Sequence, residues 1–187
     1  KLIYNHAQEH IMNPWRTISR KVLLERKPQL TVEERHVILP DGSEITDWTW
    51  LDAPEAVMVV AVDDMGRFVL LERSGYAVRG PIFAPPGGAL EPAEEPLRAA
   101  QRILLQEAGY TSPDWVFLGD FINDIDRGFG RRYYFLARQA KPATSEALPA
   151  VRLQTRQQVE DAVADGQIRE LSWQAAISMA LLRLFYL

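Results

Sequence analysis

The N-terminal part of the chain alternates between apolar and polar positions with a period of two. Residues 15–24, 29–39 and 44–51 show this alternation, and Pro40-Asp-Gly-Ser marks a turn before the third segment. A period of two is typical of strands that bury one face, and turn residues separate such strands. The pattern therefore predicts a small antiparallel unit.

A continuous run of mostly β-branched residues over positions 56–62 suits a strand that is buried on both faces. The turn Asp63-Asp-Met-Gly66 then leads into residues 67–72, which predicts a hairpin. Further segments with strand character follow it along the chain, at residues 73–83, 115–121 and 132–137.

Residues 96–109 follow a helical period instead. Pro96 fits the first turn of a helix, and Gly109 fits its left-handed end. Apolar residues recur at steps of three and four and predict one buried stripe, made of Leu97, Ala100, Leu104 and Ala108. At about 100° per residue, Ile103 and Glu107 fall side by side off this stripe, and we expect their face to open into a cleft.

Two more helices are predicted after residues 140–149, a stretch rich in Pro and Ala that we expect to be a loop. Thr155 is the candidate N-cap of a helix that runs to residue 164, and Asp165-Gly166 ends it. Residues 171–187 form an apolar helix that we expect to lie against the sheet. The sequence contains no internal repeats.

Composition fits one ordinary globular domain with a small appendage, because the 187 residues are 47% hydrophobic and 25% charged. The net charge of −4 gives no broad cationic surface for a nucleic acid polymer. The absence of cysteine excludes disulfides, thiolate zinc sites and thiol nucleophiles. No apolar run is long enough for a membrane span and no signal-peptide pattern is present, so a cytoplasmic location without a membrane partner is the default expectation.

Two polar segments offer ambiguous chemistry. The stretch His6-Ala-Gln-Glu9-His10 spells the zinc-protease motif H-x-x-E-H, but no third ligand is near it, so we favour a segment without a metal site. Residues 123–131 form a glycine-bearing loop that includes Asp124 and Asp126. Loops of this kind often contact ligands, and a plain hairpin loop fits equally well.

The segment from residue 88 to residue 110 resembles the Nudix box, G-x5-E-x7-R-E-U-x-E-E-x-G-U, in which U is a bulky apolar residue. The positions in register are Gly88, Glu94, Arg102, Leu104, Glu107, Gly109 and Tyr110. The resemblance implies an α+β protein with the Nudix fold, in which a mixed β-sheet is sandwiched between helices. It also implies Mg2+ or Mn2+ held against a diphosphate by the helix glutamates, and attack by water on one phosphorus.

The order of elements resembles the branch of ADP-ribose and nucleoside-diphosphate-sugar pyrophosphatases. Supporting stretches are Trp15-Arg-Thr-Ile-Ser-Arg20, Pro40-Asp-Gly42, Ala84-Pro-Pro-Gly-Gly88 and residues 159–168. The resemblance implies a homodimer, with residues 1–52 as a strand region and possible dimerisation arm and residues 53–187 as the Nudix domain. It implies a nucleoside diphosphate sugar or a related nucleotide as the small-molecule partner.

Two departures from the box remove carboxylates, because Ile103 replaces the Glu of the R-E pair and Gln106 replaces the first Glu of the E-E pair. Mg2+ prefers several oxygen ligands, so we expect weak binding of Mg2+ or Mn2+. Glu107 is the best remaining ligand, and Gln106 and either Glu91 or Glu94 are possible helpers.

Other departures lie outside the box. Ala84 stands where the branch has Glu, its Q-Y-R segment is reduced to Ser74-Gly75-Tyr76, and its acidic catalytic loop is reduced to Glu146. We therefore assign Glu107 and Glu146 as the candidate catalytic residues, with Asp124 or Asp126 as alternative bases.

The remaining candidate residues have binding or structural roles. Basic and aromatic residues are the candidates for substrate binding, namely Arg73, Tyr76, Arg79, Arg131, Trp48 and Trp50. For the two tryptophans, however, we favour core or interface packing over stacking on a base. Structural roles are expected for Gly88, Glu94, Arg102 and Gly109, with Glu94 able to pair with Arg98 one turn on.

Two functions follow from these residues. One is a metal-dependent pyrophosphatase that cleaves ADP-ribose or a related nucleoside diphosphate sugar between its phosphates, weakened by the missing glutamates. The other is a catalytically inactive Nudix-fold protein that binds such a nucleotide, or a protein partner, without cutting it.

Overall fold

The structure is a computed structural model that describes residues 14–144 and 148–186. By their contacts these residues form two units, the first containing residues 14–53 and 126–129 and the second containing the rest. The segment His6-Ala-Gln-Glu9-His10 and the candidate base Glu146 lie outside the described residues.

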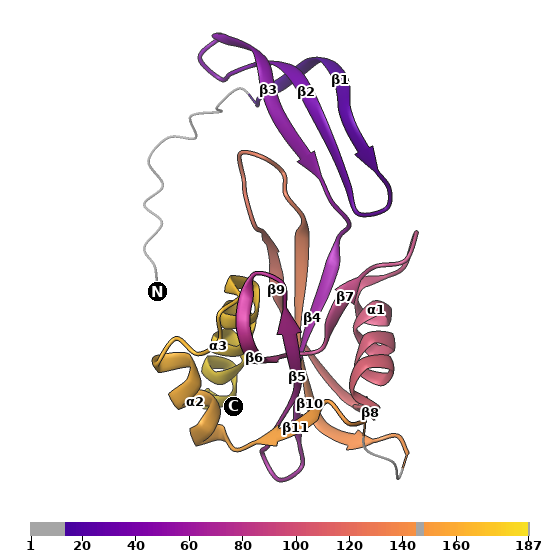
Figure 1. Ribbon diagram of the computed structural model, residues 1–187, viewed down its shortest axis with the longest axis vertical. Coiled ribbons are helices and arrows are strands. Elements are labelled where there is room, and N and C mark those ends of the chain that lie inside the picture. The colour runs from indigo at the N-terminus through magenta and orange to yellow at the C-terminus, as the bar shows by residue number, and fades with distance from the viewer. Residues whose placement is uncertain (1–13, 145–147, 187) are drawn as a thin grey trace. The chain divides into compact units, whose positions relative to one another are not determined.

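The first unit is a three-stranded antiparallel sheet in the order β1, β2, β3 (Figure 1). The strands are β1 (Arg16–Arg26), β2 (Leu30–Ile38) and β3 (Glu44–Asp52), which confirms the predicted antiparallel unit. The 126–129 segment is hydrogen-bonded to β3 through both side chains and backbone. Trp48 Nε1 donates to the carbonyl of Asp126 at 3.0 Å, and the N–H of Leu51 donates to the carbonyl of Arg127 at 2.9 Å.

Strand β1 is the exposed edge of this sheet. All of its residues are exposed, and Ile18, Val22 and Leu23 each leave about half of their surface to solvent. The described residues provide no strand partner for its outer edge. The homodimer implied by the resemblance stays a prediction, to be checked by the mass of the protein in solution.

The second unit is built on one mixed sheet with strands in the order β11, β5, β4, β10, β8. Three more strands extend it, because β6 pairs with β5, β7 with β4, and β9 with β10. The pairing of β4 with β10 is parallel and the others are antiparallel. The strand bounds are β4 (Ala56–Asp63), β5 (Phe68–Gly75), β6 (Val78–Ala84), β7 (Gly87–Ala89), β8 (Tyr110–Thr111), β9 (Asp114–Ile122), β10 (Arg131–Pro142) and β11 (Val151–Gln154).

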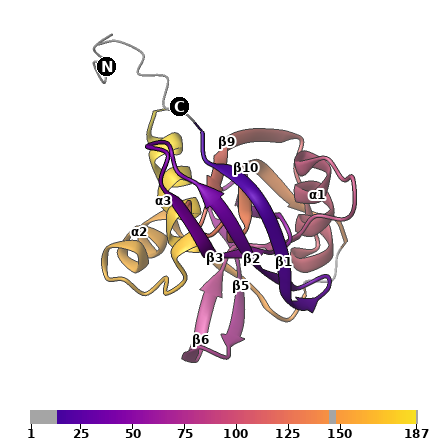
Figure 2. The ribbon, with the colours of Figure 1, turned by 90° about the horizontal axis from the view of Figure 1, so that it is seen from above.

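Helices cover both faces of this sheet (Figures 1 and 2), as the fold prediction required. They are α1 (Pro96–Ile103), continued by a π-helical turn η1 (Leu104–Ala108), then α2 (Arg156–Ala164) and α3 (Leu171–Phe185). The continuous apolar run of β4 explains both layers, because successive side chains of a strand point to opposite faces. Val57 and Val59 are fully buried in the cluster that includes α1, and Val60 is fully buried in the cluster that includes α3.

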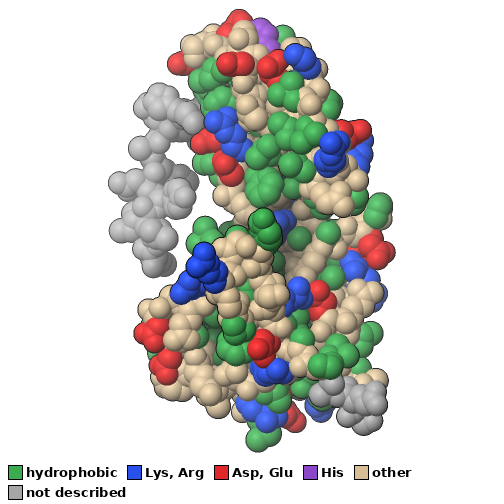
Figure 3. Space-filling model, in the orientation of Figure 1, with side chains coloured by type: hydrophobic (Ala, Val, Ile, Leu, Met, Phe, Trp, Pro, Cys, Tyr) green, Lys and Arg blue, Asp and Glu red, His purple; other side chains and the backbone are tan. Residues whose placement is uncertain are grey.

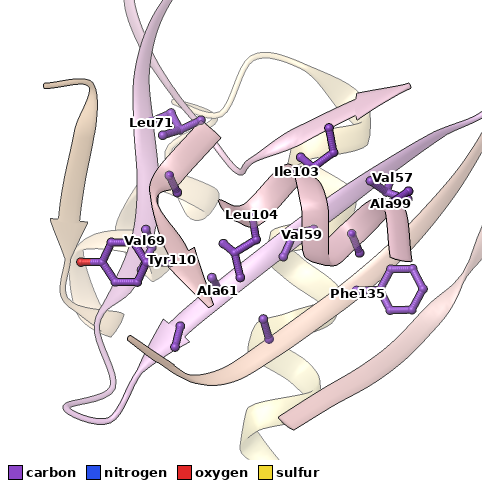
Figure 4. Packing of buried hydrophobic residues seen from close by; sticks show 14 residues of the cluster. Val57, Val59, Ala61, Val69, Leu71, Ala99, Ile103, Leu104, Tyr110 and Phe135 are labelled. Atoms are coloured by element: carbon purple, nitrogen blue, oxygen red, sulfur yellow. The ribbon is translucent and has the colours of Figure 1, made fainter. Parts of the chain in front are cut away.

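The predicted stripe of the 96–109 helix is wrong at two positions. Leu97 is 40% exposed, whereas Ile103, which we expected to face a cleft, is 6% exposed within the core. Figure 4 shows Ile103 and Leu104 among the residues of this core cluster. An apolar side chain at 103 gains more from burial than from facing a cleft. Gly109 ends the helix with φ of 70°, as predicted.

The predicted loop at residues 140–149 is wrong at its start, because strand β10 continues to Pro142. Ala140 continues β10 and lies opposite Asp63 of β4, and Lys141 and Pro142 pair with β8. Strand β11 was not predicted, because its four residues depend on pairing with β5. Thr155 caps α2 as predicted, through a reciprocal pair of hydrogen bonds with Gln158.

No helix of the described residues is long and apolar enough to cross a membrane. Basic and acidic side chains are interspersed on the face of the molecule seen in Figure 3. This mixture agrees with the small net charge of −4.

Candidate functional site

The candidate site lies where β7 meets the end of the box helix, the name used here for α1 together with η1. Strand β7 places Gly88 opposite Val57 of β4 and Gly87 opposite Met58. A Cβ atom on Gly87 would lie 2.6 Å from Met58 Sδ and 3.0 Å from the carbonyl oxygen of Val57, so a side chain there would require Met58 to move. The two glycines therefore bring the backbone of this turn close to the central strand.

Glu94 and Arg102 lock the entrance of the box helix. Arg102 Nη2 donates to Glu94 Oε2 at 2.6 Å, and its Nε donates to Glu94 Oε1 at 2.8 Å. The N–H of Glu91 donates to the same carboxylate at 2.9 Å, and Arg102 also reaches the carbonyl of Ala89. The pairing of Glu94 with Arg98 that we had considered is therefore wrong, because Glu94 pairs with Arg102. A bidentate pair with these additional bonds fixes the loop before the helix.

The same contacts hold the pKa of Glu94 at about 2, well below its ordinary value of 4.5, with the hydrogen bonds from Arg102 as the main cause. A depressed pKa means that ionised Glu94 stabilises the fold above pH 4.5 and that this contribution is lost as the pH falls toward 2.

We expect Glu94→Gln to be less stable than the natural protein at pH 7, because it removes the charge that Arg102 binds. The difference should shrink as the pH falls from 4.5 to 2, because the carboxyl takes up its proton near pH 4.5 in the unfolded state but only near pH 2 in the folded state. Urea unfolding at a series of pH values checks this. A difference that stays constant over that range would show that the ion pair contributes nothing.

Ile103 occupies the position of the missing box glutamate and packs against the turn. A Cβ atom on Gly88 would lie 2.7 Å from Ile103 Cδ1, so the two residues are in close contact. Ile103 is buried with Ala99, Ala100 and Leu104 in the core. Its side chain therefore offers nothing to a ligand and closes the space between the helix and the glycine turn.

Gln106 and Glu91 face Arg102 and not Glu107. Gln106 is exposed, and its Oε1 accepts a hydrogen bond from Arg102 Nη1 at 3.2 Å. Glu91 is also exposed, and its carboxylate lies 3.7 Å from Arg102 Nε. Both predicted metal helpers thus belong to the group around Arg102 on the outer side of the box helix.

Glu107 is bound from two other elements. Arg73 on β5 donates from Nη2 to Glu107 Oε2 at 2.6 Å, and the N–H of Gly87 on β7 donates to the same oxygen at 3.0 Å. The side chains of Arg73 and Glu107 keep 37% and 26% of their surface exposed. We had assigned Arg73 to substrate binding, and no sequence signal pointed to its pairing with a box residue or to the N–H of Gly87.

A hollow of about 450 Å³ lies beside Arg73. Its lining includes Arg73, Glu72 and Ser74 of β5 and Arg152 of β11. Arg152 forms an ion pair with Glu72 at 2.6 Å, so the hollow contains two guanidinium groups that already have carboxylate partners. The hollow can therefore offer positive charge to an anion that displaces those partners.

The other predicted substrate-binding residues of the second unit are not in this hollow. Tyr76 lies in the turn between β5 and β6 and is fully exposed, and Arg79 on β6 is exposed as well. The side chains of both have no hydrogen bond or ion pair with any described residue. Both lie on the hairpin that leads away from Arg73.

Arg131 belongs to a separate polar cluster that sequence reasoning missed. It forms an ion pair with Asp120 and lies 3.8 Å from Glu55. Tyr133 donates its hydroxyl to Glu55 at 2.8 Å, and its pKa is raised by partial burial and then by that hydrogen bond. The register of β9, β10 and β4 brings these residues together, and no motif in the sequence indicates this cluster.

Trp48 and Trp50 belong to the first unit, where their rings are covered by basic side chains. The guanidinium carbon of Arg35 lies 4.1 Å from the ring centre of Trp50, and that of Arg127 lies 4.4 Å from the ring centre of Trp48. Trp15 packs on Trp48 at a centroid distance of 5.1 Å. These contacts favour the packing role that we considered for both tryptophans.

The donor set does not fit the divalent cation that the resemblance implied. Mg2+ and Mn2+ need several oxygen ligands that converge on one point. Here Ile103 has no donor, Gln106 and Glu91 face Arg102, and Glu107 Oε2 is taken by Arg73 and Gly87. The described residues contain no group of three His, Asp or Glu side chains placed to share a metal ion.

Comparisons with known proteins agree on the fold and on the type of relative. A family profile described as NUDIX domain matches residues 52–180. The ADP-ribose pyrophosphatase of Bacillus subtilis (strain 168) is 34% identical over 98 residues, which are 52% of this chain and 51% of that protein. The matched region therefore spans about half the length of this relative. A crystal structure described as an ADP compounds hydrolase superposes with a TM-score of 0.76 at 19% identity, covering 94% of this chain and 96% of the other, which shows the fold.

Proposed function

The chain belongs to the Nudix family, and on this premise we propose that it binds a nucleoside diphosphate compound of the ADP-ribose type and releases it uncut. The observation that carries the proposal is the burial of Ile103 against Gly88, where the family box has a glutamate. Nudix hydrolases generally use divalent metals. With position 103 apolar and Gln106 turned to Arg102, the box helix provides one carboxylate, Glu107, for that chemistry.

The names of the relatives support the ligand class, because one is called an ADP-ribose pyrophosphatase and the other an ADP compounds hydrolase. The hollow beside Arg73 supports it physically. Guanidinium groups bind phosphate oxygens through paired, charge-assisted hydrogen bonds. Arg73 and Arg152 both line the hollow of about 450 Å³, which is within the usual size range of a small-molecule site. We place the diphosphate there, with its oxygens accepting from these two residues.

A second candidate function is slow hydrolysis of the same compound. One observation favours it: Glu107 Oε1 accepts no hydrogen bond from any described residue, so it is able to accept one from a water molecule. A positioned general base contributes about 10²–10⁴-fold in rate. That contribution alone gives much slower turnover than a site with a complete set of metal ligands.

One experiment separates the two candidates. We expect calorimetry to show ADP-ribose binding in the presence of a chelator, and chromatography to show no AMP after long incubation with Mg2+ or Mn2+. The double variant Arg73→Met with Arg152→Met should lose binding, because both phosphate donors are gone, whereas Arg79→Met should retain it.

Release of AMP that disappears in Glu107→Gln would contradict the first candidate and establish the second. Absence of binding by ADP-ribose and by ADP-sugars would contradict both.

A further inference from the structure

The contact between Arg73 and Glu107 joins three elements that are distant in the sequence. Arg73 is on β5, Gly87 on β7 and Glu107 on η1, and all three meet at one carboxylate oxygen. The distances of 2.6 Å and 3.0 Å are those of well-formed hydrogen bonds. Glu107 Oε2 thus already accepts hydrogen bonds from a positively charged group and from a backbone N–H.

The charges at this point already balance. Glu107 carries one negative charge and Arg73 one positive charge, and their side chains are only partly exposed. The neighbouring carboxylates of the box, Glu91 and Glu94, are directed to Arg102 by their own contacts. A divalent ion at Glu107 would therefore have to displace a guanidinium and would find no second carboxylate of the box to complete its ligands.

We infer that the guanidinium of Arg73 replaces a divalent ion as the cationic partner of Glu107, so that the protein neither needs nor responds to Mg2+ or Mn2+. The inference concerns the free protein, in which no nucleotide competes with Glu107 for Arg73, and it does not depend on whether a nucleotide is cut. The proposed role of the Arg73–Glu107 pair can be distinguished from that of an ordinary surface ion pair by one consequence. Removing the guanidinium and adding a second carboxylate should make the site responsive to metal.

Thermal unfolding with and without Mn2+ tests this. The midpoint of the natural protein should be the same in chelator and in millimolar Mn2+. Arg73→Glu places two carboxylates in contact, so its midpoint should fall in chelator and rise again by about 2–4 °C or more when Mn2+ bridges them. Arg79→Glu makes the same change of charge on the exposed hairpin and should show no response to Mn2+.

A rise in the midpoint of the natural protein with Mn2+ that is lost in Glu107→Gln would overturn the inference. The same holds if Arg73→Glu responds to Mn2+ no more than Arg79→Glu does. Should Arg73→Glu fail to fold, the electron paramagnetic resonance signal of free Mn2+ gives an independent result with the natural protein. That signal should be unchanged by added protein, and a loss that is absent with Glu107→Gln would refute the replacement of a divalent ion by Arg73.

Discussion

Replacing Ile103 by Glu lowers the free energy of unfolding at neutral pH by about 3–5 kcal/mol, the usual effect of an uncompensated charge in the interior. Ile103 is 6% exposed and packs among Ala99, Ala100 and Leu104. The substitution restores the family residue in the sequence but places a carboxylate in an apolar cluster. Urea unfolding measures the loss.

The pH dependence of the stability of Ile103→Glu separates the effect of the buried charge from the effect of the changed side-chain shape. Burial raises the pKa of a carboxyl group, so the folded variant pays for ionisation only above the ordinary pKa of Glu. Ile103→Glu should therefore lose stability relative to the natural protein as the pH rises from acid to neutral. Ile103→Gln is the uncharged control and should show a difference that does not depend on pH, and Ile103→Val should lose only about 0.5–1.5 kcal/mol.

Equal stability of the Glu and Gln variants at neutral pH would show that position 103 is open to water. Recovery of the Glu variant by Mn2+ would show that this position faces a cation site. Either result would contradict the assignment of Ile103 to the core and the function proposed from it.

Replacing Gly128 by Ala destabilises the first unit by about 2–5 kcal/mol, from backbone strain and overpacking together. Gly128 has φ of 68°, and a Cβ atom there would lie 1.9 Å from Trp50 Cζ2. The Trp50 ring has little freedom to yield, because the Arg35 guanidinium stacks on it at 4.1 Å from its centre. Near-ultraviolet circular dichroism, which senses the packing of tryptophan, should report the loss during urea unfolding.

Gly166→Ala is the matched control for the destabilisation that comes from backbone strain alone. Gly166 has φ of 65°, but a Cβ atom there would meet nothing within 4 Å. It should lose only about 1–2 kcal/mol, the strain of a left-handed alanine. If Gly128→Ala loses no more than Gly166→Ala, then the Trp50 ring does not cover Gly128 and the packing described for it is wrong.

Local patterns in the sequence predicted most of the fold. The apolar run of β4, the turn that begins at Asp63, the Thr155 cap and the Gly109 helix end each depend on neighbours within a few residues. Such signals are carried by the residue types themselves. The mixed sheet with helices on both faces was predicted from the family resemblance and is confirmed by the structural match.

The errors lie where long-range contacts decide. The burial of Ile103 depends on Gly88 and the core behind it, which a helical period cannot describe. The continuation of β10 through Ala140 depends on its partners β4 and β8. Register and tertiary packing override local preference at such positions.

The candidate site was predicted as a set of residues but not as a set of contacts. Glu94, Arg102 and Glu107 were identified from their spacing, whereas the binding of Arg73 to Glu107 crosses 34 positions of sequence. Gln106 was expected to help Glu107 as a position of the box and Glu91 as a carboxylate near the helix entrance, and both face Arg102 instead. Side-chain partners of this kind follow from the assembled sheet.

The parallel pairing of β4 with β10 has a consequence for how the chain is made. A hairpin such as β4 with β5 can form as soon as a few more residues leave the ribosome. Val57 and Val60, however, can pair with Tyr133 and Leu136 only after more than 70 further residues have been made. Non-local pairing of this kind is slow, and an uncovered apolar strand is prone to aggregate meanwhile. We therefore expect the apolar strand β4 to be exposed to aggregation during biosynthesis, until β10 has been made and can pair with it.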